Sequence, residues 1–252
     1  EHNRLTVVGP PSEGGYVYLF CLLLTYANAA EVLDGTWRPE VTNAVRDLFQ
    51  VGSTLAAAGE IQGCAVSFGW PRPNGNPPFL KRLREVYSMF GEGDVVARPR
   101  PGVSPAPKDE EIDVIAWRPR LDRAAGTSYM LGQVASGDNW MAKPIAGKPI
   151  ENFHRNWFTR SPASEARGYI FIPHAVPPVD MHGTRRERMD ALTVRYGTII
   201  DRMRLPKLTD DGMKLVEQAS VNGFYIERVE ELDAIRDWFN RQISSLHQAV
   251  AQ

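Results

Sequence analysis

The chain has 252 residues and a formal net charge of −1, with 43% hydrophobic and 23% charged residues. These values are typical of a globular protein with a substantial core, and they exclude a disordered or fibrous protein. They also exclude attraction of nucleic acid by an overall positive field, so a DNA-binding protein of this composition needs a local basic patch or a basic partner.

The first part of the chain predicts a helical accessory region. Residues 16–30 resemble a secretory signal, but the apolar run is too short to cross a bilayer and lacks a basic segment before it. We therefore interpret the run as a buried helix. A second helix is predicted from Pro39 to about Gly59, and a short strand at 61–68.

Two cysteines, Cys21 and Cys64, lie in apolar surroundings without metal-binding spacing. They predict buried free thiols in a reducing cytosol, and hence a cytoplasmic protein.

A domain boundary is expected within residues 69–78, which are dense in proline and glycine. The next helix is predicted at 79–91, where apolar residues recur at helical spacing and glycine ends the pattern. Residues 94–98 then predict a first core strand.

The segment 109–143 organises the rest of the chain. Residues 112–117 and 129–135 are strand-length apolar runs, and the basic segment between them contains Gly126, which predicts a turn. Further on, the sequence predicts a helix at 150–159, a buried strand at 168–173, a basic loop at 177–190, a strand at 194–200 and a long helix at 229–246. Together these elements predict an α/β protein with a mixed sheet between helices.

Asp113 interrupts an apolar strand, where a charge is costly to bury unless another group pairs with it. Alternation along the strands puts Asp113 on the face of Ile115, and Gln133 on the face of Leu131. If the two strands are neighbours, Asp113 and Gln133 form an oxygen-rich site suited to Mg²⁺.

The motif DEEID…GQVASG, which begins at Asp109 and ends at Gly137, resembles the PD-(D/E)xK nuclease superfamily with its restriction-endonuclease-like fold. It is most similar to the Mrr-like branch, which often carries Gln instead of Glu on the third core strand. The resemblance implies a mixed sheet flanked by helices and divides the chain into three parts. These are an N-terminal helical accessory region (1–75), a nuclease-like core (76–182) and a C-terminal strand and helices that pack on the core (183–252).

The resemblance also implies a DNA endonuclease that depends on Mg²⁺ or Mn²⁺ and acts in restriction or phage defence. Asp113, the amide of Gln133 and the carbonyl of Val134 would hold the metal. The lysine that usually follows two residues after Gln133 is replaced by Ala135, so Lys143 becomes the candidate catalytic lysine. A glutamate from the preceding helix often joins such sites, and Glu92 is preferred here to Glu85.

DNA is the expected partner, bound by the protein alone, as a homo-oligomer or in a larger defence complex, without membrane association. Arginines are crowded near the motif in sequence and would contact phosphates or form a solvated face. They are Arg98, Arg100, Arg118, Arg120 and Arg123.

One alternative from another functional class stays open. A chain that has lost the lysine would be a catalytically inactive nuclease-like module that binds DNA or a partner protein. In a purely structural interpretation, Asp113 is a carboxylate paired with an arginine and Gln133 is a satisfied buried amide.

Overall fold

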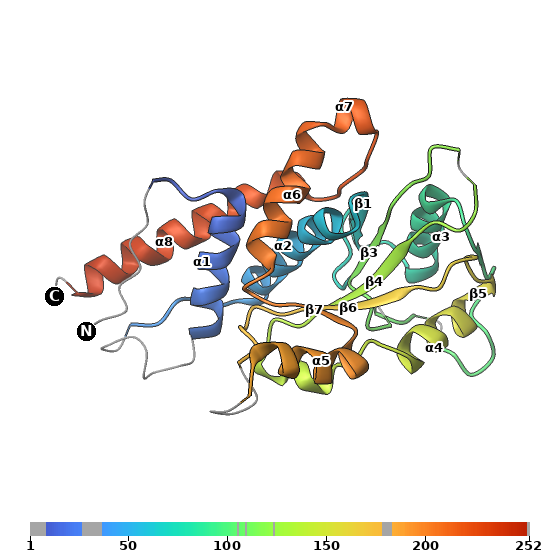
Figure 1. Cartoon of the computed structure of the whole chain (residues 1–252), viewed down its shortest axis with the longest axis horizontal. Helices are drawn as coiled ribbons and strands as arrows, with labels where there is room; N and C mark the ends of the chain where they lie inside the picture. Colours follow the sequence, from blue (N-terminus) through green and yellow to red (C-terminus); the bar gives the residue numbers. More distant parts are fainter. Residues whose placement is uncertain are drawn as a thin grey trace.

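The computed structural model of the chain describes residues 9–26, 37–104, 106–108, 110–122, 124–177 and 183–250. A central sheet is covered on both faces by helices, which gives the mixed α/β layering that the sequence predicts (Figure 1). Within the described residues, no helix combines the length and apolar character needed to cross a membrane.

The central sheet has five strands in the order β1-β3-β4-β6-β7. Strand β3 runs antiparallel to both of its neighbours, whereas β4, β6 and β7 are parallel. The predicted pairing of the second and third core strands as neighbours is confirmed. Their bounds are β1 (Cys64–Ser67), β3 (Val114–Trp117), β4 (Tyr129–Val134), β6 (Arg167–Phe171) and β7 (Thr198–Ile200).

Both faces of the sheet are buried, so successive residues of a strand enter two different cores. Ile115 and Leu131 belong to the core on one face, whereas Val114 and Met130 belong to the core on the other. This explains why the strands read as continuous apolar runs instead of alternating with polar residues.

One face is covered by α1 (Glu13–Tyr26), α2 (Asn43–Ile61), α6 (Leu205–Glu217) and α8 (Leu232–Val250). The predicted buried helix is confirmed over 13–26, and residues 27–30 of the signal-like run lie outside the described part of the chain. Cys21 and Cys64 are free and buried, as predicted.

Helix α2 differs from its prediction at both ends. It starts at Asn43, where the Thr42 side chain accepts a hydrogen bond from the Val45 backbone N–H, and not at Pro39. Gly59 does not end the helix. A Cβ at Gly59 would lie 2.0 Å from the carbonyl oxygen of Leu208, so this glycine permits close packing of α2 against α6.

The opposite face is covered by α3 (Phe79–Phe90), α4 (Lys148–Trp157), α5 (Arg185–Tyr196) and the short 3₁₀ helix η1 (Asp138–Ala142). Helix α3 ends at Gly91 in the left-handed conformation, with φ of 83°, as predicted. Helix α5 occupies part of the predicted basic loop, because Thr184 and Glu187 form a reciprocal capping box that the sequence reading overlooked.

The prediction of residues 94–98 as the first core strand is wrong. Strand β2 (Asp94–Val95) pairs only with β5 (Phe158–Arg160) in a separate two-stranded sheet. The first strand of the central sheet is β1, which precedes the proline-rich loop. The expected accessory region 1–75 therefore contains two elements of the central layers, β1 and α2.

The outer edge of β1 is covered by the segment that follows α7 (Ala219–Asn222). The Ala65 N–H donates to the Tyr225 carbonyl, and the Glu227 N–H donates to the Ala65 carbonyl. The 3₁₀ helix η2 (Val229–Glu231) then leads into α8. Backbone groups that an edge strand would expose are satisfied here by the chain itself.

Candidate functional site

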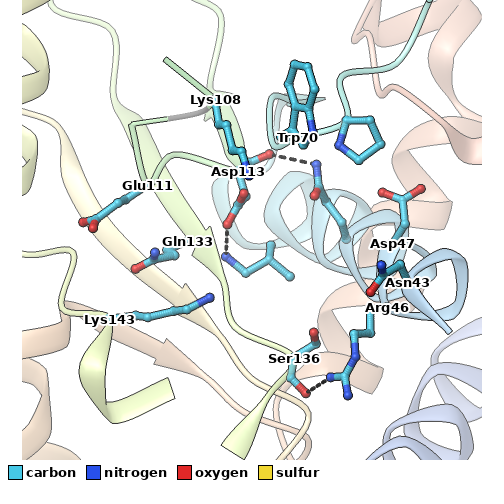
Figure 2. A pocket seen from close by; sticks show the side chains of 13 residues that line it. Asn43, Arg46, Asp47, Trp70, Lys108, Glu111, Asp113, Gln133, Ser136 and Lys143 are labelled. Carbon is cyan, nitrogen blue, oxygen red and sulfur yellow. Dashed lines mark hydrogen bonds between the residues drawn. The ribbon is translucent and has the colours of Figure 1, made fainter. Parts of the chain in front are cut away.

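A cavity of about 790 Å³ lies where β3 begins and β4 ends. Four parts of the chain line it: helix α2, the loop after β1, the segment before β3, and the segment from β4 to η1. Figure 2 shows the polar side chains of these parts gathered around one hollow. Asp113, Gln133, Val134 and Lys143, which the sequence predicts as site residues, all lie here.

Asp113 and Gln133 face each other at the start of the β3–β4 ladder. Val114 pairs with Gly132, so the next opposed positions are Asp113 and Gln133. The Asp113 N–H donates to the Gly132 carbonyl at 2.8 Å, and one Asp113 carboxylate oxygen accepts a 2.7 Å hydrogen bond from the Val134 N–H (Figure 2). The backbone of β4 therefore orients the carboxylate.

Gln133 is only 4% exposed, and its Oε1 has no hydrogen-bond donor among the described residues. A buried polar atom without a partner is costly, so native proteins seldom retain one without a reason. Nine other buried side-chain atoms of the described residues also lack a hydrogen-bond partner, and what distinguishes this oxygen is that Gln133 lines the cavity opposite Asp113.

The donor set fits a hard cation, because Mg²⁺ and Mn²⁺ prefer oxygen ligands and the Asp113 carboxylate and Gln133 amide supply them. Among the described residues, no three His, Cys, Asp or Glu side chains group as a metal site. A cation here would therefore be held by one carboxylate, one neutral amide and a main-chain carbonyl, from Asp113, Gln133 and Val134.

Lys143 follows η1, and its backbone N–H closes the turn on the Trp140 carbonyl at 3.0 Å. Its side chain points into the cavity from the side of Gln133 (Figure 2). The turn is anchored to α5, because the Tyr196 hydroxyl donates to the Met141 carbonyl at 2.6 Å and the Tyr196 ring contacts Trp140. The predicted short helix that carries Lys143 to the site is present.

Helix α2 contributes side chains that the sequence reading missed, since it assigned this helix to an accessory region. Gln50 is buried, and its amide donates to Ser67 Oγ at 2.5 Å and to the Asp113 carbonyl at 3.3 Å. In the sequence, the feature that could have indicated this role is the long amide side chain of Gln50 within the largely apolar run 49–59. Glu111 and Lys108 also line the cavity.

Asp47 lines the cavity but is paired with Arg228. The two Arg228 terminal nitrogens donate to its two carboxylate oxygens, at 3.1 Å and 2.5 Å. Arg228 also contacts Glu231 at 2.6 Å. Burial works against the charge of Arg228, but these acidic partners outweigh burial and raise its pKa. Asp47 therefore shares one guanidinium with Glu231, and the three groups together keep a net negative charge at the edge of the cavity.

Gly69 brings the loop after β1 against the site. A Cβ at Gly69 would lie 2.4 Å from an Asp113 carboxylate oxygen and 2.5 Å from Gln50 Oε1. Only glycine allows the backbone to pass this close without displacing one of the two side chains.

Glu92 does not join this cavity, which corrects the prediction that it contributes to the site. Its carboxylate accepts hydrogen bonds from the backbone N–H groups of Thr127 at 2.7 Å and Ala163 at 3.2 Å, at the other end of the hairpin. Burial alone would raise the pKa of Glu92, but these donors outweigh it and hold that pKa below its ordinary value. Because both donors are backbone groups, Glu92 stabilises the turn between β3 and β4.

The predicted DNA-binding arginines are separated from the cavity. Arg118 and Arg120 follow β3 at the turn end, roughly 16 Å along the strand from Asp113. Arg120 donates to the Gly126 carbonyl at 2.8 Å, and Arg100 donates to the Phe158 carbonyl at 2.6 Å. Arg98 follows β2 and is exposed, and Arg123 lies outside the described residues. Nearness in sequence to the motif did not predict nearness in space.

A scan of protein-family models, a search of curated proteins and a search of solved structures each gave no significant match to this chain. The function is therefore inferred from the residues and their geometry.

Proposed function

We propose that this protein is a metal-dependent nuclease that hydrolyses phosphodiester bonds of DNA. The observation that carries the proposal is that Asp113 and Gln133, whose buried Oε1 has no partner among the described residues, occupy opposed strand positions and line one cavity that Lys143 also enters. A bound Mg²⁺ or Mn²⁺ would neutralise phosphate charge and lower the pKa of an attacking water.

Each residue has a separate role in this proposal. Asp113, Gln133 and the Val134 carbonyl would hold the cation. The Lys143 ammonium would stabilise the negative charge that develops on the phosphate, the kind of electrostatic contribution that is largest in a partly enclosed site. Gln50 would fix the position of the Asp113 main chain through its hydrogen bond to the carbonyl.

The surroundings of Ala135 and Lys143 also support the proposal that Lys143 replaces the lysine usually found two residues after Gln133. Ala135 is fully buried in a core, so a lysine at that position would have to place its charge among apolar side chains. Lys143 reaches the cavity from the next turn of the chain instead. The motif's resemblance to the Mrr-like nucleases, together with a mixed sheet whose antiparallel strand β3 follows directly from Asp113, supports the same proposal.

The test is cleavage of supercoiled plasmid with Mg²⁺ or Mn²⁺ by the wild-type protein and by Asp113→Asn. We expect cleavage by wild type and none above background by the variant. Asparagine keeps an oxygen that can accept from the Val134 N–H, so the melting temperature should change little. Glu92→Gln is the matched control, because it makes the same chemical change outside the cavity and should leave cleavage intact.

Cleavage by Asp113→Asn at the wild-type rate would refute the active-site assignment. If wild type binds DNA but cleaves none with either metal, the protein is a non-catalytic nuclease-like module. The role in restriction or phage defence rests on the family resemblance alone. Its test is a phage plaque assay in cells that express wild type or Asp113→Asn, where only wild type should reduce plaque number.

A further inference from the structure

Trp70 is unusually exposed for a tryptophan, and it lines the same cavity as Asp113 and Lys143. Its side chain is 46% exposed, whereas the tryptophans at 117, 140, 157 and 238 are all less than 9% exposed. It stands at the rim of the hollow, in the loop that passes over Asp113 at Gly69 (Figure 2). An exposed ring at the rim of a polar cavity is available to stack on a flat ligand that binds there.

The loop that carries Trp70 is held in place by Arg72. Arg72 is only 3% exposed, and its guanidinium lies 5.4 Å from the Trp70 ring centroid and 5.4 Å from that of Phe79. It donates to the carbonyls of Pro77 and Pro107, both at 3.1 Å. The tryptophan is therefore positioned before any ligand arrives, which lowers the entropy cost of binding to it.

An unpaired nucleobase is the ligand that fits such a ring beside a phosphate-binding site. Every base has a flat π-face that stacks on an aromatic side chain, whereas bases inside a duplex already stack on one another. The charges do not favour either form of DNA, because the cavity is lined by Arg46, Lys108 and Lys143 and by the acidic residues Asp47, Glu111 and Asp113. The exposed ring is therefore the feature that points to an unpaired base.

We infer that the substrate is single-stranded DNA, or a duplex with an unpaired segment, and that one base stacks on Trp70 while an adjacent phosphate lies at Asp113, Gln133 and Lys143. This inference rests on the proposed nuclease function. It assigns Trp70 as the residue that selects unpaired over paired DNA.

Binding is tested without cleavage, with oligothymidylate in the presence of a chelator and tryptophan fluorescence as the readout. We expect the oligonucleotide to quench wild-type fluorescence and to leave Trp70→Phe unchanged. Trp37→Phe is the matched control, because Trp37 is half-buried and donates to Ser245 Oγ on α8 at 3.1 Å, so this variant should be quenched like wild type. Trp70→Ala should bind a labelled oligonucleotide at least about fivefold more weakly, as expected for one lost stacked base.

Cleavage separates this inference from the function itself. Wild type should cut single-stranded and gapped DNA faster than intact duplex, and Trp70→Ala should lose that preference. If wild type and Trp70→Ala bind oligothymidylate equally, or if intact duplex is preferred, the inference about Trp70 is wrong and the nuclease proposal is unaffected. If oligothymidylate quenches wild type but no DNA is cut, the nuclease proposal fails and the unpaired-base site remains.

Discussion

The two ends of the β3–β4 hairpin carry polar groups in very different states. At the turn end, Glu92 accepts from two backbone N–H groups and Arg120 donates to the Gly126 carbonyl. At the open end, Asp113 lies opposite Gln133, whose buried Oε1 has no partner among the described residues. Both ends are rich in charged and polar residues in the sequence. Each end holds a carboxylate that accepts from backbone N–H groups, and what differs is the cavity at the open end, which Asp113 shares with Gln133 and Lys143.

Among the variants that test the difference between the two ends, Lys143→Met should reduce DNA cleavage the most. The variant removes the ammonium from the open end and keeps the length of the side chain, so we expect DNA cleavage to fall by about 10²-fold. Plasmid nicking rates measure the loss. Lys108→Met is the control, because Lys108 lines the same cavity but is exposed, and its replacement should cost less. A larger loss for Lys108→Met would make that residue the catalytic cation.

Gly69→Ala should have the next largest effect. The added methyl group would push on Asp113 and Gln50, and a small displacement of a reacting group lowers the rate by about tenfold or more. Single-turnover cleavage and thermal melting measure the two consequences separately. Gly75→Ala is a control in the same loop, where a Cβ meets nothing within 4 Å, although its φ of 79° adds backbone strain. Equal cleavage by Gly69→Ala and wild type would mean that Asp113 need not hold its observed position.

At the turn end we expect a substitution to lower the free energy of unfolding and to leave DNA cleavage unchanged. Glu92→Gln should destabilise the protein by about 1 kcal/mol at neutral pH, after allowance for solvent screening. The folded pKa of Glu92 lies below its ordinary value, so its contribution is present above the unfolded pKa and is lost as pH falls through the folded pKa. The difference in melting temperature between wild type and variant should therefore shrink between pH 7 and about pH 3. A constant difference over this range would contradict the assignment.

The smallest effect is expected for the double variant Arg118→Gln, Arg120→Gln. The Arg118 backbone lies roughly 16 Å along the strand from Asp113, and Arg120 follows two residues later, so both start from beyond the Debye length of about 8 Å at physiological salt. Cleavage and its salt dependence should stay close to wild type. A marked loss of affinity across unrelated DNA sequences would show that DNA extends along the whole hairpin, and would restore the phosphate-contact role that the sequence predicts for these arginines.

The sequence by itself determined the local features of this protein. The apolar runs predicted the strands β3 and β4, because run length, composition and the turn signals between the runs are local features. The helical spacing and Gly91 predicted α3 with its end. Asp113 and Gln133 stood out as polar residues inside apolar strands, whereas Lys143 was proposed only from the resemblance to a nuclease motif whose usual lysine is replaced by Ala135.

Only the tertiary structure decided which strands share the sheet and which side chains meet. Cys64 pairs with Trp117 and Met130 with Arg167, across long separations in sequence that no periodicity encodes. These pairings bring α2 and Gln50 to Asp113 and place Trp70 at the same cavity, while β2 and Glu92 lie elsewhere. Hydrophobic patterning specifies that a strand is buried but not its neighbour, because any apolar strand of suitable length can satisfy the same backbone groups.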